Sequence, residues 1–138
     1  MALVLDTGPL YALLDVDDPA NRAALRMLAA NTERRVIPAP VLPELDYMLR
    51  SRGAPEGMDW VLDDVRRGVF VVEDLHRDDY ARVAEVVRRY ADAGVGFVDA
   101  AVLAVVERLG ERKLATLDRR HFSILRPRHV DALELLPA

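Results

Sequence analysis

Short apolar runs alternate with longer amphipathic stretches along this chain of 138 residues. Residues 2–5 are wholly apolar and lead into an Asp-Thr-Gly-Pro segment, a pattern that predicts a buried strand followed by a turn. Other brief runs, rich in β-branched or aliphatic residues, have the length of strands rather than of helices. The sequence predicts these further strands at residues 36–37, 69–72, 114–116 and 132–136.

The amphipathic stretches between these strands have the spacing of helices. Their apolar residues recur three or four positions apart and so share one helical face. The stretch 98–109 is almost continuously apolar, which predicts a helix packed on more than one side. Helices are predicted over 10–14, from a start signal at Asp17-Asp18-Pro19 to Leu28, from Val41 to near Gly53, from Met58 to Gly68, from Tyr80 to Gly94 and over 98–109.

The alternation of strands and helices indicates an α/β fold, with a parallel sheet covered by helices on both faces. The chain has the usual length of one compact domain and contains no repeat and no linker rich in proline or glycine. We therefore expect a single domain over residues 1–138. Sheets of this kind bind ligands beyond the carboxyl ends of their strands, so acidic residues that directly follow strands are candidates for a functional site.

Composition narrows the possible chemistry. The formal net charge is −4, so the average field of the molecule does not attract nucleic acid, and any binding of RNA must come from local arginines and bound cations. The absence of cysteine excludes disulfides and thiolate metal sites. The apolar run at 2–5 is too short for a signal peptide or a membrane span, so we expect a cytoplasmic protein without membrane contact.

Four carboxylates occupy positions that suit a shared site. Asp6 follows the first strand and Asp118 follows the strand at 114–116. Each could belong to a functional site at the sheet edge, or could only form a turn or cap a helix. Asp99 lies in the first turn of the apolar helix. Burying its charge there is costly unless hydrogen-bond donors or a cation compensate. Its alternative role is to cap the helix. Glu44 lies at the edge of an apolar helix face, which directs it toward the sheet edge unless it turns out to solvent.

Carboxylates gathered at one place repel one another and raise each other's pKa values, and a divalent cation relieves that repulsion. Magnesium takes oxygen ligands and uses only one or two carboxylates beside water and phosphate oxygens. An acidic site without cysteine or clustered histidine therefore fits Mg²⁺ or Mn²⁺ and argues against zinc. The three histidines show no ligand spacing, so we expect surface or structural roles for His76, His121 and His129.

Four segments carry these acids and their neighbours in a characteristic order. They are Val4-Leu5-Asp6-Thr7 with residues 10–14 after it, Pro43-Glu44-Leu45, Phe97 to Ala101, and Ala115 to Phe122. Together they resemble the PIN-domain family, and within it the VapC-type toxins of bacterial toxin–antitoxin pairs. The resemblance covers essentially the whole chain. It implies a three-layer fold with a parallel sheet of about five strands, and a metal-dependent endoribonuclease activity.

The resemblance also implies a role for each acidic residue. Asp6 and Asp99 match the principal metal ligands of the family, and Asp118 matches a ligand that acts directly or through water. Glu44 matches the residue that holds metal-bound water, and Thr116 matches a hydroxyl position beside the last acid. The implied cofactor is Mg²⁺, with Mn²⁺ able to substitute. The implied reaction is hydrolysis of RNA phosphodiester bonds by metal-activated water.

The implied partners are an RNA substrate and a cognate antitoxin whose C-terminal segment covers the acidic groove. The resemblance also implies a homodimer, and the apolar helix at 98–109 fits either a dimer interface or internal packing. The densest basic stretch fits either contacts with RNA phosphates or an ordinary solvated surface. This stretch contains Arg119, Arg120, Arg126 and Arg128.

Three other functions fit the sequence less well. A response-regulator receiver domain needs a lysine after its last core strand, whereas Lys113 precedes its strand. A nucleotide-binding module needs a glycine-rich phosphate loop, and the chain has no G-x-x-x-x-G-K-[ST] segment. A catalytically weak PIN-like module that binds only RNA or protein would keep the fold, and a test for magnesium-dependent RNA cleavage distinguishes it from an enzyme.

Overall fold

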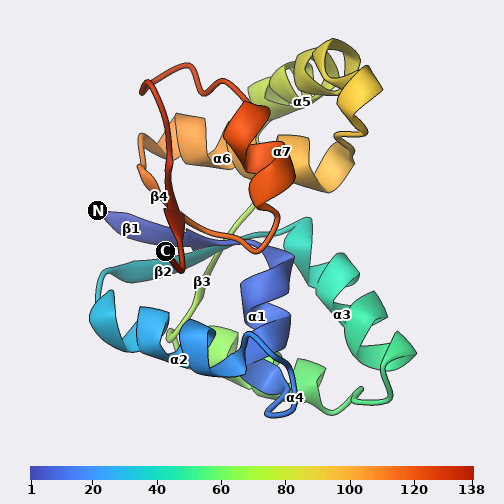
Figure 1. Ribbon diagram of the computed structural model, residues 1–138, viewed down its shortest axis with the longest axis vertical. Coiled ribbons are helices and arrows are strands. Elements are labelled where there is room, and N and C mark those ends of the chain that lie inside the picture. Colours follow the sequence, from blue (N-terminus) through green and yellow to red (C-terminus); the bar gives the residue numbers. More distant parts are fainter.

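A parallel five-stranded sheet forms the centre of the computed structural model, which describes residues 1–138 (Figure 1). Every pair of neighbouring strands is parallel, as predicted. The spatial order of the strands is β3-β2-β1-β4-β5. The strands are β1 (Ala2–Leu5), β2 (Arg34–Pro38), β3 (Val71–Glu73), β4 (Lys113–Ala115) and β5 (Glu134–Leu136).

Helices cover both faces of the sheet, which completes the predicted three-layer α/β fold (Figure 1). One layer contains α1 (Thr7–Leu14), α2 (Asn21–Ala30), α3 (Val41–Ser51) and α4 (Gly57–Arg66). The other contains α5 (Arg77–Arg89), the 3₁₀ turn η1 (Ala91–Ala93), α6 (Phe97–Leu109) and α7 (Arg119–Ile124). None of these helices combines the length and the apolar character that crossing a bilayer requires.

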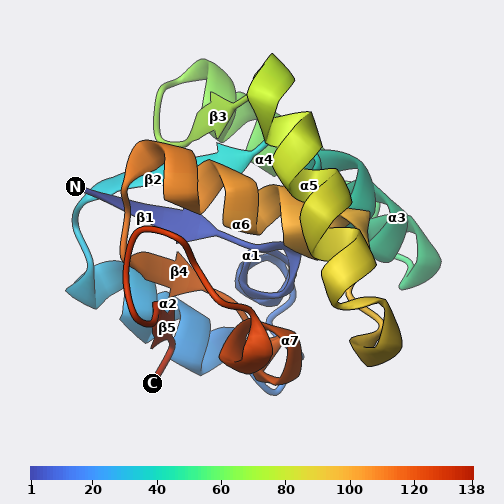
Figure 2. The ribbon, with the colours of Figure 1, turned by 90° about the horizontal axis from the view of Figure 1, so that it is seen from above.

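The core lies where apolar strands meet apolar helix faces. All of β1 is buried, because helices cover both of its faces and strands flank both of its edges. Seven consecutive residues of α6, from Ala100 to Val106, are buried as well. Figure 2 shows α6 lying over the sheet and running along the strands, with α5 packed alongside it. Internal packing therefore explains the continuous apolar character of the stretch 98–109.

Most predicted elements are present with shifted ends, and two differences have clear causes. The first helix begins at Thr7 rather than at residue 10, because the Asp6 carboxylate caps it by accepting a hydrogen bond from the Thr7 N–H. The sequence pattern does not predict α7, which has six residues and no repeated apolar spacing. Two tertiary features hold α7: the buried side chain of Phe122, and the Asp118 carboxylate at its N-terminus.

The strand order reverses between β1 and β4, and this point defines the edge where ligands bind in such sheets. The chain passes from β1 to β2 and β3 on one side, while β4 and β5 lie on the other. Asp6 and Thr116 directly follow these two strands and meet at their carboxyl ends. Lys113 begins β4 and pairs with Glu33, which precedes β2, so it lies at the opposite edge, as predicted. That position excludes a receiver-type site.

Candidate metal centre

Asp6 is fixed at the carboxyl end of β1 by three hydrogen bonds. Its backbone N–H donates to the Ala115 carbonyl of the neighbouring strand β4 over 2.9 Å. Its Oδ1 accepts from the Thr7 N–H and its Oδ2 from the Thr116 hydroxyl, each over 2.8 Å. Only 5% of the residue is exposed. The fold thus orients a nearly buried carboxylate at the reversal point of the sheet.

Burial raises the pKa of the Asp6 carboxyl to about 6. Removal from water is the largest cause, because it disfavours the charged form. Hydrogen bonds from Thr7 and Thr116 lower the pKa without compensating for burial, and the negative charges of Asp99 and Glu44 raise it further. A carboxylate in these surroundings is stabilised by a cation.

The Thr116 hydroxyl connects Asp6 with the turn that leads into α7. It donates its hydrogen to Asp6 and accepts a hydrogen bond from the Asp118 N–H over 3.0 Å. The side chain of Asp118 in turn accepts from the His121 N–H over 3.0 Å and caps α7. Asp118 is therefore a helix cap, as one reading of the sequence proposed, and also lies beside the other acids.

Asp99 and Asp118 converge on one ring nitrogen of His121. Its Nδ1 lies 2.9 Å from Oδ2 of Asp99 and 2.8 Å from Oδ2 of Asp118. The other ring nitrogen, Nε2, lies 3.0 Å from the carbonyl oxygen of Ala93 in η1. One ligand atom from each of the three side chains lies within 4.8 Å of the other two. We call Asp99, Asp118 and His121 the central group.

The electrostatics of the central group reflect its mixed charges. The pKa of Asp99 is raised, first by burial and then by the charge of Asp118, although the nearby His121 acts to lower it. Burial acts to lower the pKa of His121, but hydrogen bonds to Asp118 and Ala93 and the charges of both aspartates raise it above its ordinary value. The two carboxylates therefore favour the protonated form of His121, whose positive charge would reduce their mutual repulsion.

His121 lies within the acidic site, a position that the sequence did not predict. The ring is half-buried in the acidic site, whereas His76 is exposed and His129 contacts the backbone of Glu111. Asp118 and His121 are three residues apart, a spacing that places two side chains on one face of a helix. This signal was present in the sequence, but it carries meaning only once residues 119–124 are known to be helical.

Asp6 and Glu44 flank the central group without belonging to it. Glu44 is exposed on α3, so it is less shielded than its position on the helix predicted. It is nevertheless close enough for its charge to raise the pKa values of both Asp6 and Asp99. The fold thus gathers all four predicted acids in one region, and adds a nitrogen donor to a site expected to contain only oxygen. Such a donor set fits a hard or borderline divalent cation.

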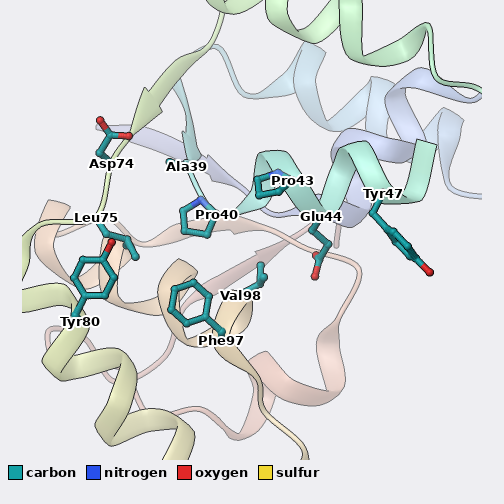
Figure 3. A pocket seen from close by; sticks show the side chains of 10 residues that line it. All are labelled: Ala39, Pro40, Pro43, Glu44, Tyr47, Asp74, Leu75, Tyr80, Phe97 and Val98. Atoms are coloured by element: carbon teal, nitrogen blue, oxygen red, sulfur yellow. The ribbon is translucent and has the colours of Figure 1, made fainter. Parts of the chain in front are cut away.

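A pocket of about 730 Å³ opens beside Glu44, between α3, the start of α5 and the start of α6 (Figure 3). Its three aromatic residues, Tyr47, Tyr80 and Phe97, are all exposed. Phe97 and Val98 directly precede Asp99, so the pocket adjoins the acidic site. Its remaining lining comes from Ala39, Pro40, Pro43, Asp74 and Leu75.

The basic stretch predicted as a possible RNA contact divides into two kinds of residue. Arg119 donates to the carbonyls of Leu135 and Pro137, and Arg128 pairs with Glu85, so both are engaged within the fold. The side chains of Arg120 and Arg126 are exposed and form no ion pair within the chain.

Comparison with known proteins places this geometry in a family. The sequence model of the PIN domain matches residues 3–126. Ribonuclease VapC26 of Mycobacterium tuberculosis (strain ATCC 25618 / H37Rv) is 30% identical over 125 residues, which cover 91% of this chain and 93% of the relative.

Solved structures show the same fold at lower sequence identity. Mycobacterium tuberculosis VapC20, described as a sarcin-ricin loop cleaving toxin, has a TM-score of 0.73 and 24% identity, covering 81% of this chain and 86% of its own. VapBC2 from Rickettsia felis, solved with a fragment of promoter DNA, has a TM-score of 0.68 and 20% identity and covers 98% of both chains. DNA-bound VapBC from Salmonella typhimurium has a TM-score of 0.66 and 22% identity, with the same coverage.

Proposed function

This chain belongs to the PIN domain family, and from that premise we propose that it is the toxin of a toxin–antitoxin pair, a metal-dependent endoribonuclease. The observation that carries the proposal is the convergence of carboxylates from three separate elements at the strand-order reversal. Asp6 follows β1, Asp99 lies in the first turn of α6 and Asp118 caps α7. Burial and mutual repulsion raise the pKa values of Asp6 and Asp99, a cost that a bound divalent cation would offset.

We propose Asp6, Asp99 and Asp118 as ligands of this cation, which we take to be Mg²⁺ with Mn²⁺ able to substitute. When bound, the ion would lower the pKa of water and neutralise charge on the phosphodiester. The exposed carboxylate of Glu44 lies near Asp6 and Asp99 and is placed to hold the attacking water and accept its proton. Thr116 keeps the Asp6 carboxylate in one orientation through its hydroxyl.

The proposed substrate is RNA, cut in the cytoplasm as an unpaired segment. Single-stranded RNA is recognised largely through bases that stack on aromatic side chains. Three such rings line the pocket that Glu44 also lines: Tyr47, Tyr80 and Phe97 (Figure 3). Exposed Arg120 and Arg126 are available for phosphates.

The proposed protein partner is a cognate antitoxin whose C-terminal segment lies over the acidic groove. This proposal is supported by the similarity of the chain to proteins that were solved as VapBC bound to DNA. A basic side chain from such a segment would match the negative charge of Asp6, Asp99 and Asp118. Because the segment would lie over the same groove as RNA, binding of one would exclude the other. We propose that the free toxin is a homodimer, through a surface other than the buried part of α6.

Cleavage of RNA by the purified chain tests the proposed reaction. We expect cleavage with Mg²⁺ or Mn²⁺, none with EDTA, and a loss of at least about 100-fold in rate for Asp99→Asn, because the variant removes a charge that holds the ion. Asp131→Asn, in an exposed loop, is the matched control and should keep the wild-type rate. Wild-type cleavage by Asp99→Asn would contradict the assignment. RNA binding without cleavage by the wild type would favour the catalytically weak binding module.

A further inference from the structure

We propose that Nδ1 of His121 is a direct ligand of the divalent cation, so that the centre binds Mn²⁺ through nitrogen as well as oxygen. The inference rests on the metal site of the proposed function and adds a ligand to it. His121 is the one member of the central group that is not acidic, and the proposed reaction gives it no role. Its position, its hydrogen bonds and its donor chemistry each support the assignment.

The spacing of the three side chains fits neighbouring ligands around one ion. Nδ1 lies 2.9 Å from the Asp99 oxygen and 2.8 Å from the Asp118 oxygen. Two ligands at right angles on an ion with bonds of about 2.1 Å lie roughly 3 Å apart. The nitrogen and the two oxygens therefore need little movement to share an ion.

The second ring nitrogen has the partner that a metal-binding histidine requires. Nε2 faces the carbonyl oxygen of Ala93 at 3.0 Å. A carbonyl can only accept a hydrogen bond, so Nε2 carries a hydrogen. A cation would therefore bind at Nδ1, where it would replace the hydrogen that Nδ1 shares with the two carboxylates when no ion is bound. Histidine ligands usually donate their other N–H to a carbonyl or carboxylate in this way, which fixes the orientation of the ring.

Two elements hold the ring in place. His121 lies in the first turn of α7, where its backbone N–H is bound by the capping carboxylate of Asp118. The next residue, Phe122, is buried in the core and anchors that turn. The nitrogen therefore faces the carboxylates through the packing of the helix and not only through its hydrogen bonds.

A nitrogen ligand changes which ions the centre prefers. Mg²⁺ binds almost entirely through oxygen, whereas imidazole suits first-row transition metals. Because a site of oxygen ligands alone already binds Mn²⁺ somewhat better than Mg²⁺, the informative quantity is the ratio of the two affinities with and without the ring. We expect His121 to increase that ratio in favour of Mn²⁺.

A purely positioning role would leave a different signature. In that role His121 would only hold the Asp118 and Asp99 carboxylates by hydrogen bonds. The variant His121→Asn retains an N–H donor on a short side chain near the position of Nδ1, but it removes the imidazole nitrogen. A positioning role therefore predicts an unchanged ratio of Mn²⁺ to Mg²⁺ affinity in this variant.

The test measures Mn²⁺ bound to the whole chain, without RNA. Electron paramagnetic resonance gives the Mn²⁺ affinity, competition gives the Mg²⁺ affinity, and electron spin echo modulation detects a directly bound nitrogen. We expect nitrogen modulation in the wild type that changes when histidine is labelled with ¹⁵N. His121→Asn should lose it and bind Mn²⁺ about ten-fold more weakly or worse, with a smaller loss for Mg²⁺. His129→Asn is the control, because His129 also contacts a backbone carbonyl, and should match the wild type.

Each outcome decides the proposal. Absence of nitrogen modulation in the wild type, or its persistence in His121→Asn, would overturn the assignment. The ¹⁵N labelling keeps the wild-type measurement decisive even if His121→Asn does not fold. Nitrogen-bound Mn²⁺ in a protein that cleaves no RNA would support the ligand and overturn the ribonuclease function. RNA cleavage that depends on Asp99, without any nitrogen ligand, would support the ribonuclease function and overturn the assignment of His121 as a ligand.

Discussion

Single residues of the centre are held in states that are unfavourable without a cation. Asp6 is nearly buried and meets the negative charges of Asp99 and Glu44, while two hydrogen bonds compensate only in part. The raised pKa of Asp6 means that its charged form is less stable in the folded chain than in the unfolded one. Its native charge therefore costs folding free energy in the absence of metal.

Replacing this charge should stabilise the metal-free protein. The pKa of Asp6 is 3.8 in the reference state and about 6 in the fold, so the cost of its charge is absent below pH 4, grows between pH 4 and 6, and is constant above. In EDTA at pH 7.5 we expect Asp6→Asn to raise the unfolding temperature by about 3–6 °C, allowing for one weakened hydrogen bond. Calorimetry should show this difference vanishing at pH 4. A lower unfolding temperature for Asp6→Asn at pH 7.5 would contradict the burial argument.

The Thr116 hydroxyl should affect metal affinity through Asp6. Thr116→Val removes the donor to Asp6 and the acceptor for the Asp118 N–H while keeping the shape of the side chain. We expect the affinity for Mn²⁺ to fall about ten-fold or more, as for other partners of metal ligands. Thr116→Ser retains the hydroxyl and should restore most of the affinity in a calorimetric titration. Equal affinities for the valine and serine variants would remove this role from Thr116.

At the scale of elements, a buried ion pair fixes the two helices that flank the centre. Arg82 of α5 donates to both carboxylate oxygens of Glu107 on α6, over 2.8 and 2.9 Å. Both side chains are only 9% exposed. A further hydrogen bond from Arg82 to the Arg126 carbonyl ties in the segment that follows α7. These contacts fix the relative positions of the helices that lead to Ala93, Asp99 and His121.

Breaking this pair from one side should be costly. Arg82→Ala leaves the Glu107 carboxylate buried without its main partner, so we expect the free energy of unfolding to fall by about 3–5 kcal/mol. Urea denaturation followed by circular dichroism measures the loss. Arg66→Ala is the matched control, because Arg66 forms an exposed pair with Asp63, and it should cost less than about 1 kcal/mol. Similar losses for both variants would show that burial does not determine the strength of the pair.

At the scale of the whole molecule, the net charge of −4 opposes binding of the proposed RNA substrate, so that binding would depend on a local basic surface. The fold engages Arg119 and Arg128 internally and leaves Arg120 and Arg126 exposed. A phosphate contact releases counterions, so each arginine that makes one contributes to the salt dependence of binding.

Removing both exposed arginines should weaken RNA binding uniformly across sequences. In an Asp99→Asn background, which prevents cleavage, we expect Arg120→Ala with Arg126→Ala to reduce the slope of log affinity against log salt by about 1–2. Fluorescence anisotropy with a single-stranded RNA measures the slope. The double variant Arg66→Ala with Arg67→Ala, at the C-terminal end of α4, changes the net charge equally and should leave the slope unchanged. Equal slopes for both double variants would place the RNA contacts elsewhere.

The sequence by itself determined the layers and the acidic residues. Periodicity predicted the parallel sheet and most helices, because apolar spacing reflects burial that each element needs wherever it lies. Asp6 and Asp118 were identifiable because they directly follow strands. Asp99 was identifiable because it lies in the first turn of the most apolar helix, and Glu44 because it lies at the edge of an apolar helix face. The predicted single domain over residues 1–138 and the roles of these residues as ligands stay predictions.

The tertiary structure alone decided what lies between those acids. His121 reaches Asp99 only because β4 lies beside β1 and because α7 contacts both η1 and the start of α6, from which it is far apart in the sequence. Helix α7 itself depends on the Asp118 cap and on buried Phe122 rather than on local propensity. Periodicity indicates which side of an element is buried, but it does not indicate which other element covers that side. The arrangement of the whole chain decides this, and it therefore also decides that nitrogen and oxygen donors meet at one site.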